Sequence, residues 1–374
     1  MFCFVPRLKD LNPDFANPRR AKLRATQDQV GHTVKPKRQL IYALTAAIPI
    51  LLGALGASAQ NVRLNELVAE NASWTNFAGR LSDWVELHNP GEADVDLSDM
   101  GLSDQQAAPR RWVFPNGVQL PAHGFLVVFC EGNEPASTNA GGPLNTGFGL
   151  KSSGGRLYLW QAGPGAPLAD AVVYGMQLPD LGIGRIAPDA EWQLVKPTPG
   201  AANEAVPLGN SSRLRFNEWM ASPASGDDWF EIYNPEEFPV AIGGFYLTDT
   251  LANQTQYHIP ELSFIGTEAS AYALFHADNS PNKGADHTNF KLNSGGEVLG
   301  LFDTNGVTVI DSVVFGPQLP GVSEGRFPDG SDHIGRLVDN PTPGRGNLIS
   351  PHTTAKQQRA RRSRPATSAA SARC

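Results

Sequence analysis

Cysteine is scarce in this sequence, with three residues among 374. Cys3 and Cys374 lie near the two ends of the chain, and Cys130 follows the apolar run 125–129. A chain without a credible internal pair cannot rely on disulfides, so its stability must come from a hydrophobic core, in which Cys130 is expected at a strand end. The composition allows such a core and excludes wholesale disorder, because 41% of the residues are hydrophobic and 18% are charged.

Several motifs of common enzymes are also missing. There is no HExxH zinc motif, no phosphate-binding P-loop and no GxGxxG dinucleotide motif. No window of about a dozen residues in the middle of the chain keeps a helical period, which argues against a helical domain there. The net charge of −7 argues against a dedicated nucleic-acid binder.

Residues 1–59 differ from the rest, with nine basic and three acidic side chains. The basic run 35–38 precedes an uncharged stretch that ends in Ala57-Ser58-Ala59, a pattern that signal peptidase accepts. We therefore expect an N-terminal extension and a secretory signal peptide cleaved after Ala59, with translation starting near Val34. The alternative is an uncleaved anchor, since the uncharged stretch is long enough to span a bilayer. Either way, the basic flank predicts an exported chain, in the periplasm, on the cell surface or outside the cell.

The opposite end is also basic. Residues 350–374 contain six Lys and Arg residues and no acidic residue, among Ala, Ser, Thr, Gln and Pro. Such a segment cannot bury apolar area, so residues 349–374 are predicted to form a disordered basic tail. Binding of a polyanion by this tail is a possible role, although a solvated tail without function is favoured.

The middle of the chain is a tandem duplication, in which a series of short motifs recurs in the same order. The offset between the copies drifts only between 141 and 152 residues, so insertions are small. The matched pairs are 63–66 with 215–218, 83–90 with 228–235, 101–104 with 246–249, 112–115 with 257–260, 146–150 with 288–292, 153–155 with 294–296, 170–175 with 311–316, and the closing Pro-Thr-Pro-Gly-x-x-Asn segments 197–203 and 341–347.

Each copy consists of short apolar runs separated by Gly and Pro turns. In the run 84–88, Val85 and Leu87 alternate with Trp84, Glu86 and His88, as in a β-strand. The runs 125–129 and 272–275 are predicted to be central strands. Many short strands within about 140 residues favour a β-sandwich. The predicted boundaries are 60–205 for the first sandwich, 206–212 for a linker and 213–348 for the second sandwich.

The recurring motifs resemble the bacterial form of the lamin tail domain, over residues 61–205 and 213–348. They are Asn-Glu, Asp-Trp-hydrophobic-Glu-Leu/Ile-x-Asn, Leu-Ser/Thr-Asp, Phe-x-Leu-x-Ser-Gly-Gly, Gly-Arg and the closing Pro-Thr-Pro-Gly-x-x-Asn. The resemblance implies an all-β chain of two tandem immunoglobulin-like β-sandwiches. It also implies a binding or envelope-associated module of an exported bacterial protein, sometimes beside hydrolases, with no catalytic residues. The second copy departs at Gly243-Gly244, where the first has Ser98-Asp99.

A site essential to the repeated unit should occur in both copies, and no histidine does. His88 is aligned with Tyr233, and His258 with Val113. His276 and His287 are assigned to a loop around residues 278–286 that the shorter first copy lacks. Nucleophilic or zinc chemistry based on histidine therefore has little support from the sequence.

Two acidic clusters are candidates for cation sites. The first consists of Asp94, Asp96 and Asp99. It lacks EF-hand spacing and has no acidic counterparts in the second copy, so a solvated loop is favoured. The second consists of Asp278, Asp286 and His287, and it is the weaker candidate. No metal ligand, cofactor-binding residue or catalytic residue is assigned from the sequence.

Some polar residues do recur in both copies, which leaves two interpretations open. One is a hydrolytic site built from paired carboxylates. The favoured one is structural: turn hydrogen bonds and an Arg–carboxylate pair that satisfies buried backbone groups. Trp84 and Trp229 are likewise expected to pack in the core rather than to stack on sugars. The recurring residues are Asn65/Asn217, Glu66/Glu218, Asp83/Asp228, Glu86/Glu231, Asp104/Asp249, Asp170/Asp311 and Arg185/Arg326.

The sequence therefore predicts an exported, non-enzymatic interaction or adhesion module that binds an unknown protein or envelope partner. Its binding residues are expected in variable loops such as 131–146 and 278–286. The alternatives are an accessory protein of a metal-dependent hydrolase or nuclease, and polyanion binding by the tail. Residues 61–347 carry 15 basic and 34 acidic side chains, so nucleic-acid binding by the folded domains is not expected. No membrane span is expected in the mature chain.

Overall fold

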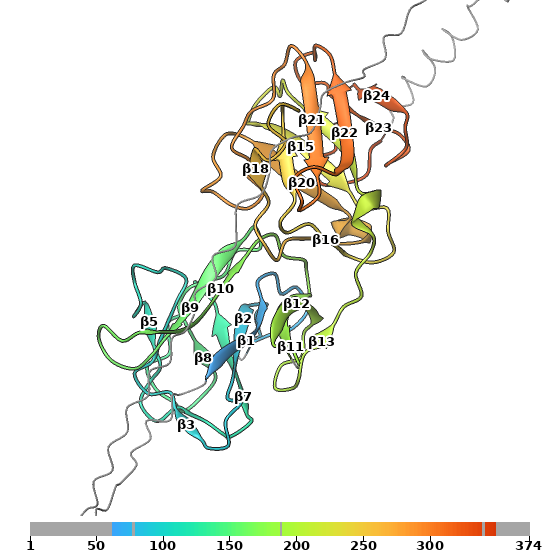
Figure 1. Ribbon diagram of the computed structural model, residues 1–374. Coiled ribbons are helices and arrows are strands. Elements are labelled where there is room, and N and C mark those ends of the chain that lie inside the picture. Colours follow the sequence, from blue (N-terminus) through green and yellow to red (C-terminus); the bar gives the residue numbers. More distant parts are fainter. Residues whose placement is uncertain (1–61, 77–78, 188, 339–340, 349–374) are drawn as a thin grey trace, which may run out of the picture. The chain divides into compact units, whose positions relative to one another are not determined.

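The computed structural model describes residues 62–76, 79–187, 189–338 and 341–348 (Figure 1). These residues form strands and turns, with two single-turn 3-10 helices, η1 (Ser211–Arg213) and η2 (Glu268–Ser270). The all-β class expected from the sequence is therefore confirmed. The predicted signal peptide and the basic tail lie outside the described residues. Among the residues described, no helix has the length and apolar character needed to cross a membrane.

The first repeat has two main sheets. One has the strand order β13-β12-β11-β1-β2-β7-β8 and the other the order β10-β9-β4-β5, while β3 pairs with β6. The bounds are β1 (Arg63–Val68), β2 (Asp83–His88), β3 (Val95–Asp96), β4 (Gly101–Ser103), β5 (Trp112–Val113), β6 (Gln119–Leu120), β7 (Phe125–Cys130), β8 (Leu144–Asn145), β9 (Gly155–Trp160), β10 (Leu168–Tyr174), β11 (Gly182–Ile186), β12 (Glu191–Lys196) and β13 (Glu204–Ala205).

The second repeat has the same plan. Its main sheets have the orders β20-β15-β14-β23-β24 and β18-β17-β21-β22, and β16 pairs with β19. The bounds are β14 (Arg215–Met220), β15 (Asp228–Tyr233), β16 (Val240–Ala241), β17 (Tyr246–Thr248), β18 (Tyr257–His258), β19 (Phe264–Ile265), β20 (Tyr272–Ala277), β21 (Glu297–Phe302), β22 (Val309–Phe315), β23 (Ser323–Arg326) and β24 (Ile334–Leu337).

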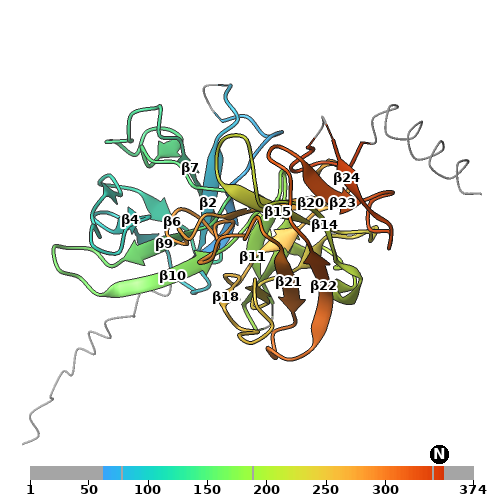
Figure 2. The same cartoon turned by 90° about the horizontal axis from the view of Figure 1, so that it is seen from above.

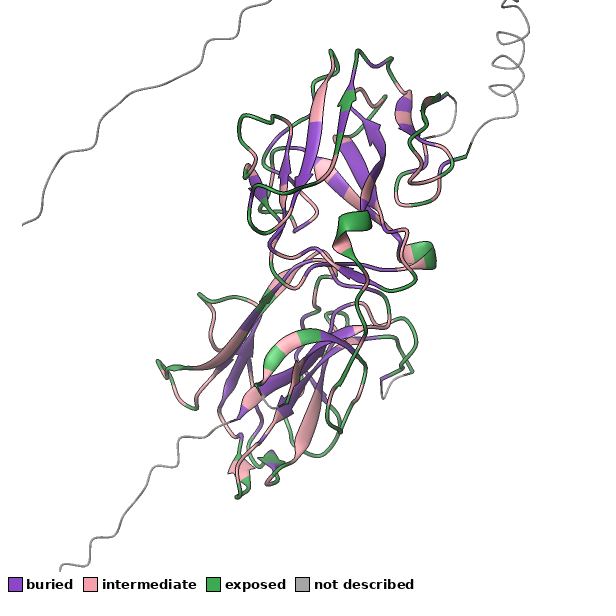
Figure 3. Ribbon diagram, turned by 45° about the vertical axis from the view of Figure 1, so that its right-hand side comes forward, coloured by how far each residue is buried: buried purple, intermediate pink, exposed green. Residues whose placement is uncertain are grey.

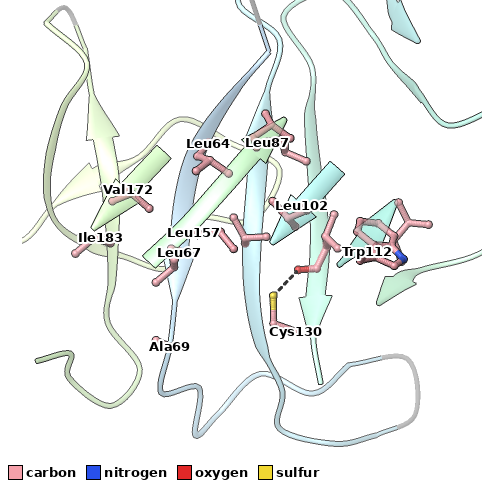
Figure 4. Close-up of a cluster of buried hydrophobic side chains, with 14 of the residues drawn as sticks. Leu64, Leu67, Ala69, Leu87, Leu102, Trp112, Cys130, Leu157, Val172 and Ile183 are labelled. Carbon is pink, nitrogen blue, oxygen red and sulfur yellow. Dashed lines mark hydrogen bonds between the residues drawn. The ribbon is translucent and has the colours of Figure 1, made fainter. Parts of the chain in front are cut away.

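The core of each repeat lies between its two main sheets. In the first repeat, Leu64 of β1 and Leu87 of β2 pack with Leu102 of β4 and Leu157 of β9, and all four are fully buried (Figure 4). Figure 3 shows that buried residues follow the strands, whereas exposed residues lie mostly in turns and loops. Two sheets that bury their facing sides in this way form a β-sandwich.

The alternation predicted for the run 84–88 is confirmed, but neither face of the strand is solvated. Val85 and Leu87 belong to the main core, whereas Trp84 packs with Val68 and Phe129 in a separate small cluster. Glu86, on the same face as Trp84, is fully buried as well. A buried carboxylate requires hydrogen-bond partners, and these are described below.

The prediction that the run 272–275 is a central strand is wrong. Strand β20 is an edge strand of its sheet among the described residues, whereas its counterpart β7 lies between β2 and β8. The pairing that adds β8 to β7 in the first repeat is reduced in the second to a single parallel bridge between His276 and His287. One bridge is too short to count as a strand, so the sheet ends at β20.

Candidate functional site

The recurring carboxylates meet in pairs on neighbouring strands. Glu66 of β1 lies opposite Glu86 of β2, and Glu218 of β14 lies opposite Glu231 of β15. A register shift next to Glu66, and another next to Glu218, interrupts the regular pairing in both repeats. Bulges of this kind re-aim side chains, and here each one falls at the asparagine of the Asn-Glu doublet. All four glutamates are fully buried.

In the first repeat, the two carboxylates bind the closing Pro-Thr-Pro-Gly segment. Thr198 donates its backbone N–H to Glu66 Oε1 over 3.1 Å and its hydroxyl to Glu66 Oε2 over 2.9 Å. Gly200 donates its backbone N–H to Glu86 Oε2 over 2.5 Å, and Asn65 Nδ2 donates to Glu86 Oε1 over 2.9 Å. We call this arrangement, residues 65, 66, 86, 198, 200 and 203, the carboxylate clasp.

The clasp of the second repeat has the same contacts at equivalent positions: residues 217, 218, 231, 342, 344 and 347. Thr342 donates its backbone N–H over 3.1 Å and its hydroxyl over 2.7 Å to Glu218 Oε2. Gly344 donates its backbone N–H to Glu231 Oε2 over 2.8 Å, and Asn217 Nδ2 donates to Glu231 Oε1 over 2.9 Å. Two copies of one hydrogen-bond set indicate that the clasp is part of the repeated unit.

The final asparagine of the closing segment completes each clasp. Asn203 Nδ2 donates to the carbonyl oxygens of Asn65 and Arg185 over 3.0 Å each. Asn347 Nδ2 donates to the carbonyl oxygens of Asn217 and Arg326 over 3.1 and 2.8 Å. These carbonyl groups lie where a strand bulges or ends, so the asparagines satisfy backbone acceptors that the sheets leave free.

The recurring Arg–Asp pair connects the two sheets of each sandwich. Asp170 of β10 accepts the backbone N–H of Leu64 over 2.9 Å, and Arg185 Nε donates to the carbonyl oxygen of Leu64 over 2.9 Å. The Arg185 guanidinium also contacts Asp170 Oδ1 over 2.9 Å. Asp311 and Arg326 repeat this arrangement in the second sandwich. The pair therefore joins the edge strand of one sheet to a central strand of the other.

Burial raises the pKa values of the clasp carboxyl groups. It raises the pKa of Glu66 to about 7 and the pKa of Glu231 to about 8. The pKa values of Glu86 and Glu218 are also raised by burial. Perturbed carboxylates often mark active sites, but these four are fully buried and their oxygens already accept hydrogen bonds from the chain. The geometry favours the structural interpretation over the hydrolytic one.

One motif was missed by the sequence reasoning. Gly321-Val322-Ser323-Glu324-Gly325 matches the GxSxG pattern of serine hydrolases. Ser323, however, is fully buried on β23, and its hydroxyl donates to Glu218 of the clasp. A nucleophile needs a general base and access to substrate, and Ser323 has a clasp carboxylate but no access. The first repeat has Gly182 at the equivalent position, so the match is also confined to one copy.

The remaining recurring acids and tryptophans have local contacts. Asp83 accepts the backbone N–H of Leu150 over 3.2 Å, and burial raises its pKa to about 6. Asp104 pairs with Arg111, whereas the second repeat has Gln256 at the position equivalent to Arg111. Trp84 is fully buried and Trp229 is 9% exposed, which agrees with packing rather than sugar stacking.

The acidic loop 94–99 does not converge on a common point. Asp94 accepts the backbone N–H of Ala122, Asp96 accepts from Ser98, and Asp99 pairs with Arg110. Each carboxylate thus has its own partner in the part of the chain described. The side chains of His276, Asp286 and His287, by contrast, do lie close enough to share an ion. They are considered further below.

The fold and these contacts define a class of protein: tandem immunoglobulin-like modules whose shared polar residues hold the sandwiches together. A family model for the Lamin Tail Domain matches residues 56–175 and 208–317, which is more than half of the chain and one match per repeat. The chain therefore belongs to the Lamin Tail Domain family, a non-enzymatic immunoglobulin-like domain. Comparisons with curated proteins and with solved structures found no match.

Proposed function

We propose that the chain is an exported, non-enzymatic interaction module that binds a partner protein along the outer edges of its two sandwiches. The family and the duplication support a binding role, and the uncharged stretch 40–59 with its Ala-x-Ala end supports export. Because the recurring glutamates form the clasps and the recurring Arg–Asp pairs join the sheets, a binding surface common to both repeats is expected to be built from other residues.

The observation that carries the proposal is a duplicated, exposed apolar edge. Strand β10 is hydrogen-bonded only to β9, and β22 only to β21, among the strands described (Figure 2). Leu168 and Val173 of β10 are 43% and 49% exposed, and Val309 and Val314 at the equivalent positions of β22 are 51% and 79% exposed. The two strands therefore present exposed apolar residues at the same two positions, beside an edge that pairs with no other strand among those described.

Such edges are normally protected in soluble proteins. An unpaired strand offers a row of N–H and C=O groups, and proteins guard it with charges, proline or a covering segment. Both β10 and β22 are seven residues long and lack Lys, Arg and Pro, and the one charged residue of each, Asp170 or Asp311, pairs with an arginine of its own sandwich. An extended segment of another protein can add to such an edge through backbone hydrogen bonds, with its side chains contacting the exposed valines. We therefore favour β-strand addition as the binding mode, over the loops 131–146 and 278–286.

Site-directed photocrosslinking in the native host tests this proposal. A photoreactive residue is placed at position 173, at position 314 and, as a matched control, at Val307, an exposed valine in the turn before β22. We expect the same partner at positions 173 and 314 and none at 307. The adduct should be lost when the second exposed apolar residue of the same strand, Leu168 or Val309, is changed to lysine. Fractionation of the same cells reports whether the chain is exported. Equal crosslinking at all three positions would exclude the edges as the binding surface.

The two alternatives have no comparable support. The clasp carboxylates are closed to solvent, and polyanion binding would depend on the tail, which lies outside the described residues. The excess of 34 acidic over 15 basic side chains in residues 61–347 also opposes binding of nucleic acid by the sandwiches.

A further inference from the structure

The second repeat carries two histidines at positions where the first repeat has a packed aromatic residue and an asparagine. His276 pairs with Trp229 across the sheet, as Phe129 pairs with Trp84. The backbone N–H of Thr288, which follows His287, donates to the carbonyl oxygen of His276. The N–H of Thr146, which follows Asn145, donates to that of Phe129 in the same way. His276 and His287 therefore occupy the positions of Phe129 and Asn145.

The backbone brings these side chains together with a carboxylate. The N–H of His276 donates to the carbonyl oxygen of Asp286 over 2.7 Å, which folds the loop back onto β20. The two imidazole rings stack with centroids 4.7 Å apart and an interplanar angle of 20°. One nitrogen of each ring and one carboxylate oxygen of Asp286 all lie within 4.8 Å of one another. Asp286 Oδ1 and His287 Nε2 are 4.0 Å apart.

A buried carboxylate fixes the state of one imidazole. Asp278 Oδ2 lies 2.9 Å from His287 Nδ1, and the Asp278 side chain is 1% exposed. Because a carboxylate accepts hydrogen bonds, Nδ1 donates to it, and the lone pair of the neutral ring is then on Nε2. Lys283 Nζ also contacts Asp278 Oδ2, over 2.6 Å, so the carboxylate keeps its charge. A carboxylate behind the imidazole is the usual support of a metal-binding histidine.

The cluster also has an unsatisfied acceptor. Asp286 Oδ1 is buried and has no hydrogen-bond partner among the described residues. A side chain at residue 284 would start 2.3 Å from this oxygen, so Gly284 keeps the space beside it open. A buried carboxylate oxygen without a donor is costly, and a bound cation would satisfy it together with the free nitrogen of His287.

We propose that His276, Asp286 and His287 bind a divalent zinc-class cation, with water as the fourth ligand and Asp278 supporting His287. Two imidazoles and one carboxylate suit Zn²⁺ better than Ca²⁺ or Mg²⁺, which prefer oxygen ligands. Zinc–ligand bonds of about 2.0–2.1 Å place tetrahedral ligand atoms about 3.3 Å apart. The three side chains must therefore rotate on binding, and the two imidazoles must leave their stacked arrangement so that the plane of each ring contains the ion. The ion would tie the loop 278–287 to β20, a structural role that is independent of the proposed partner binding.

Metal binding by the full chain tests the proposal, and the first repeat supplies conservative variants. After treatment with a chelator, the protein is titrated with Zn²⁺ in a calorimeter and with Co²⁺ in an absorption spectrometer. We expect one equivalent to bind, with the visible spectrum of four-coordinate Co²⁺. His276→Phe and His287→Asn install the residues found at these positions in the first repeat, so they should fold, and each should weaken binding more than tenfold.

Two further variants separate this site from other histidines. Asp278→Asn should weaken binding by about 10- to 100-fold, as loss of a supporting carboxylate does. His258→Gln removes a half-exposed histidine of the same repeat and should leave the affinity unchanged. The proposal is overturned if no stoichiometric binding occurs, or if His276→Phe and His287→Asn bind Zn²⁺ as tightly as the wild type, because the ion would then bind elsewhere in the chain.

Discussion

Because Glu231 is buried, we predict that this protein loses stability as the pH rises from 5 to 9. Burial raises the pKa of Glu231 from 4.5 to about 8, so the folded chain keeps this proton to a higher pH than the unfolded chain. Between these two values the folded state binds more protons, and its stability therefore falls as pH rises. The contribution is complete below pH 4.5 and is lost as pH rises through about 8. Integration from pH 5 to pH 9 gives about 4 kcal/mol for this one group.

The substitution Glu231→Gln isolates that contribution, because glutamine does not titrate. At pH 5 the variant should be less stable by about 1–3 kcal/mol, since its amide NH₂ must face one of two donors, Asn217 Nδ2 or the N–H of Gly344. At pH 9 the order should reverse, because the wild type has by then lost about 4 kcal/mol. The assay is urea unfolding of the full chain, followed by tryptophan fluorescence, at pH values from 5 to 9.

A matched control distinguishes this effect from a general loss of charge. Glu237 lies on the surface of the same repeat, and Glu237→Gln should change stability by less than about 0.5 kcal/mol at every pH. If the curves of Glu231→Gln and the wild type stay parallel from pH 5 to pH 9, Glu231 is ionised in the folded protein throughout and the reasoning is refuted.

Two further predictions concern the other contacts of the repeated unit, and both are measured by urea unfolding at pH 7. Thr342→Val removes the hydroxyl that donates to buried Glu218 and should cost about 1–3 kcal/mol, whereas Thr304→Val on the surface should cost less than about 0.5 kcal/mol. Equal effects would contradict a stabilising clasp. Arg185→Met leaves Asp170, whose side chain is 17% exposed, without a counter-charge and should cost about 1–3 kcal/mol, against about 0–1 kcal/mol for Lys196→Met in an exposed pair. A cost below 1 kcal/mol for Arg185→Met would show that the sheets are not joined through it.

The duplication made most of the fold predictable. A residue that recurs at the same place in both copies is expected to serve the repeated unit itself, and a polar residue that flanks a strand is most often a hydrogen-bond partner. This reasoning identified Glu66, Glu86 and their counterparts as structural from the sequence, together with the Arg–Asp pair. It did not reveal that the closing Pro-Thr-Pro-Gly-x-x-Asn segment is what the carboxylates bind. The two parts lie more than 100 residues apart in the sequence, and no local pattern records their contact.

The same reasoning discounted the cluster of His276, Asp286 and His287, which lies in the second repeat alone. Comparison of the copies discounts His276 and His287, because it assigns them to a loop that the first copy lacks. That assignment is wrong: His276 lies on β20, and the two histidines have the counterparts Phe129 and Asn145. Yet one copy of a duplicated domain can carry a site at positions that the other copy fills with different residues, since the fold needs only that the two positions be filled. The cluster is apparent only from the spatial arrangement. A parallel bridge places the two imidazoles side by side, and buried Asp278 orients one of them. Neither contact can be inferred from spacing, because the bridge depends on how the loop 278–287 returns to β20. Repetition is therefore a sound guide to what holds the sandwich together and a poor guide to what one sandwich binds.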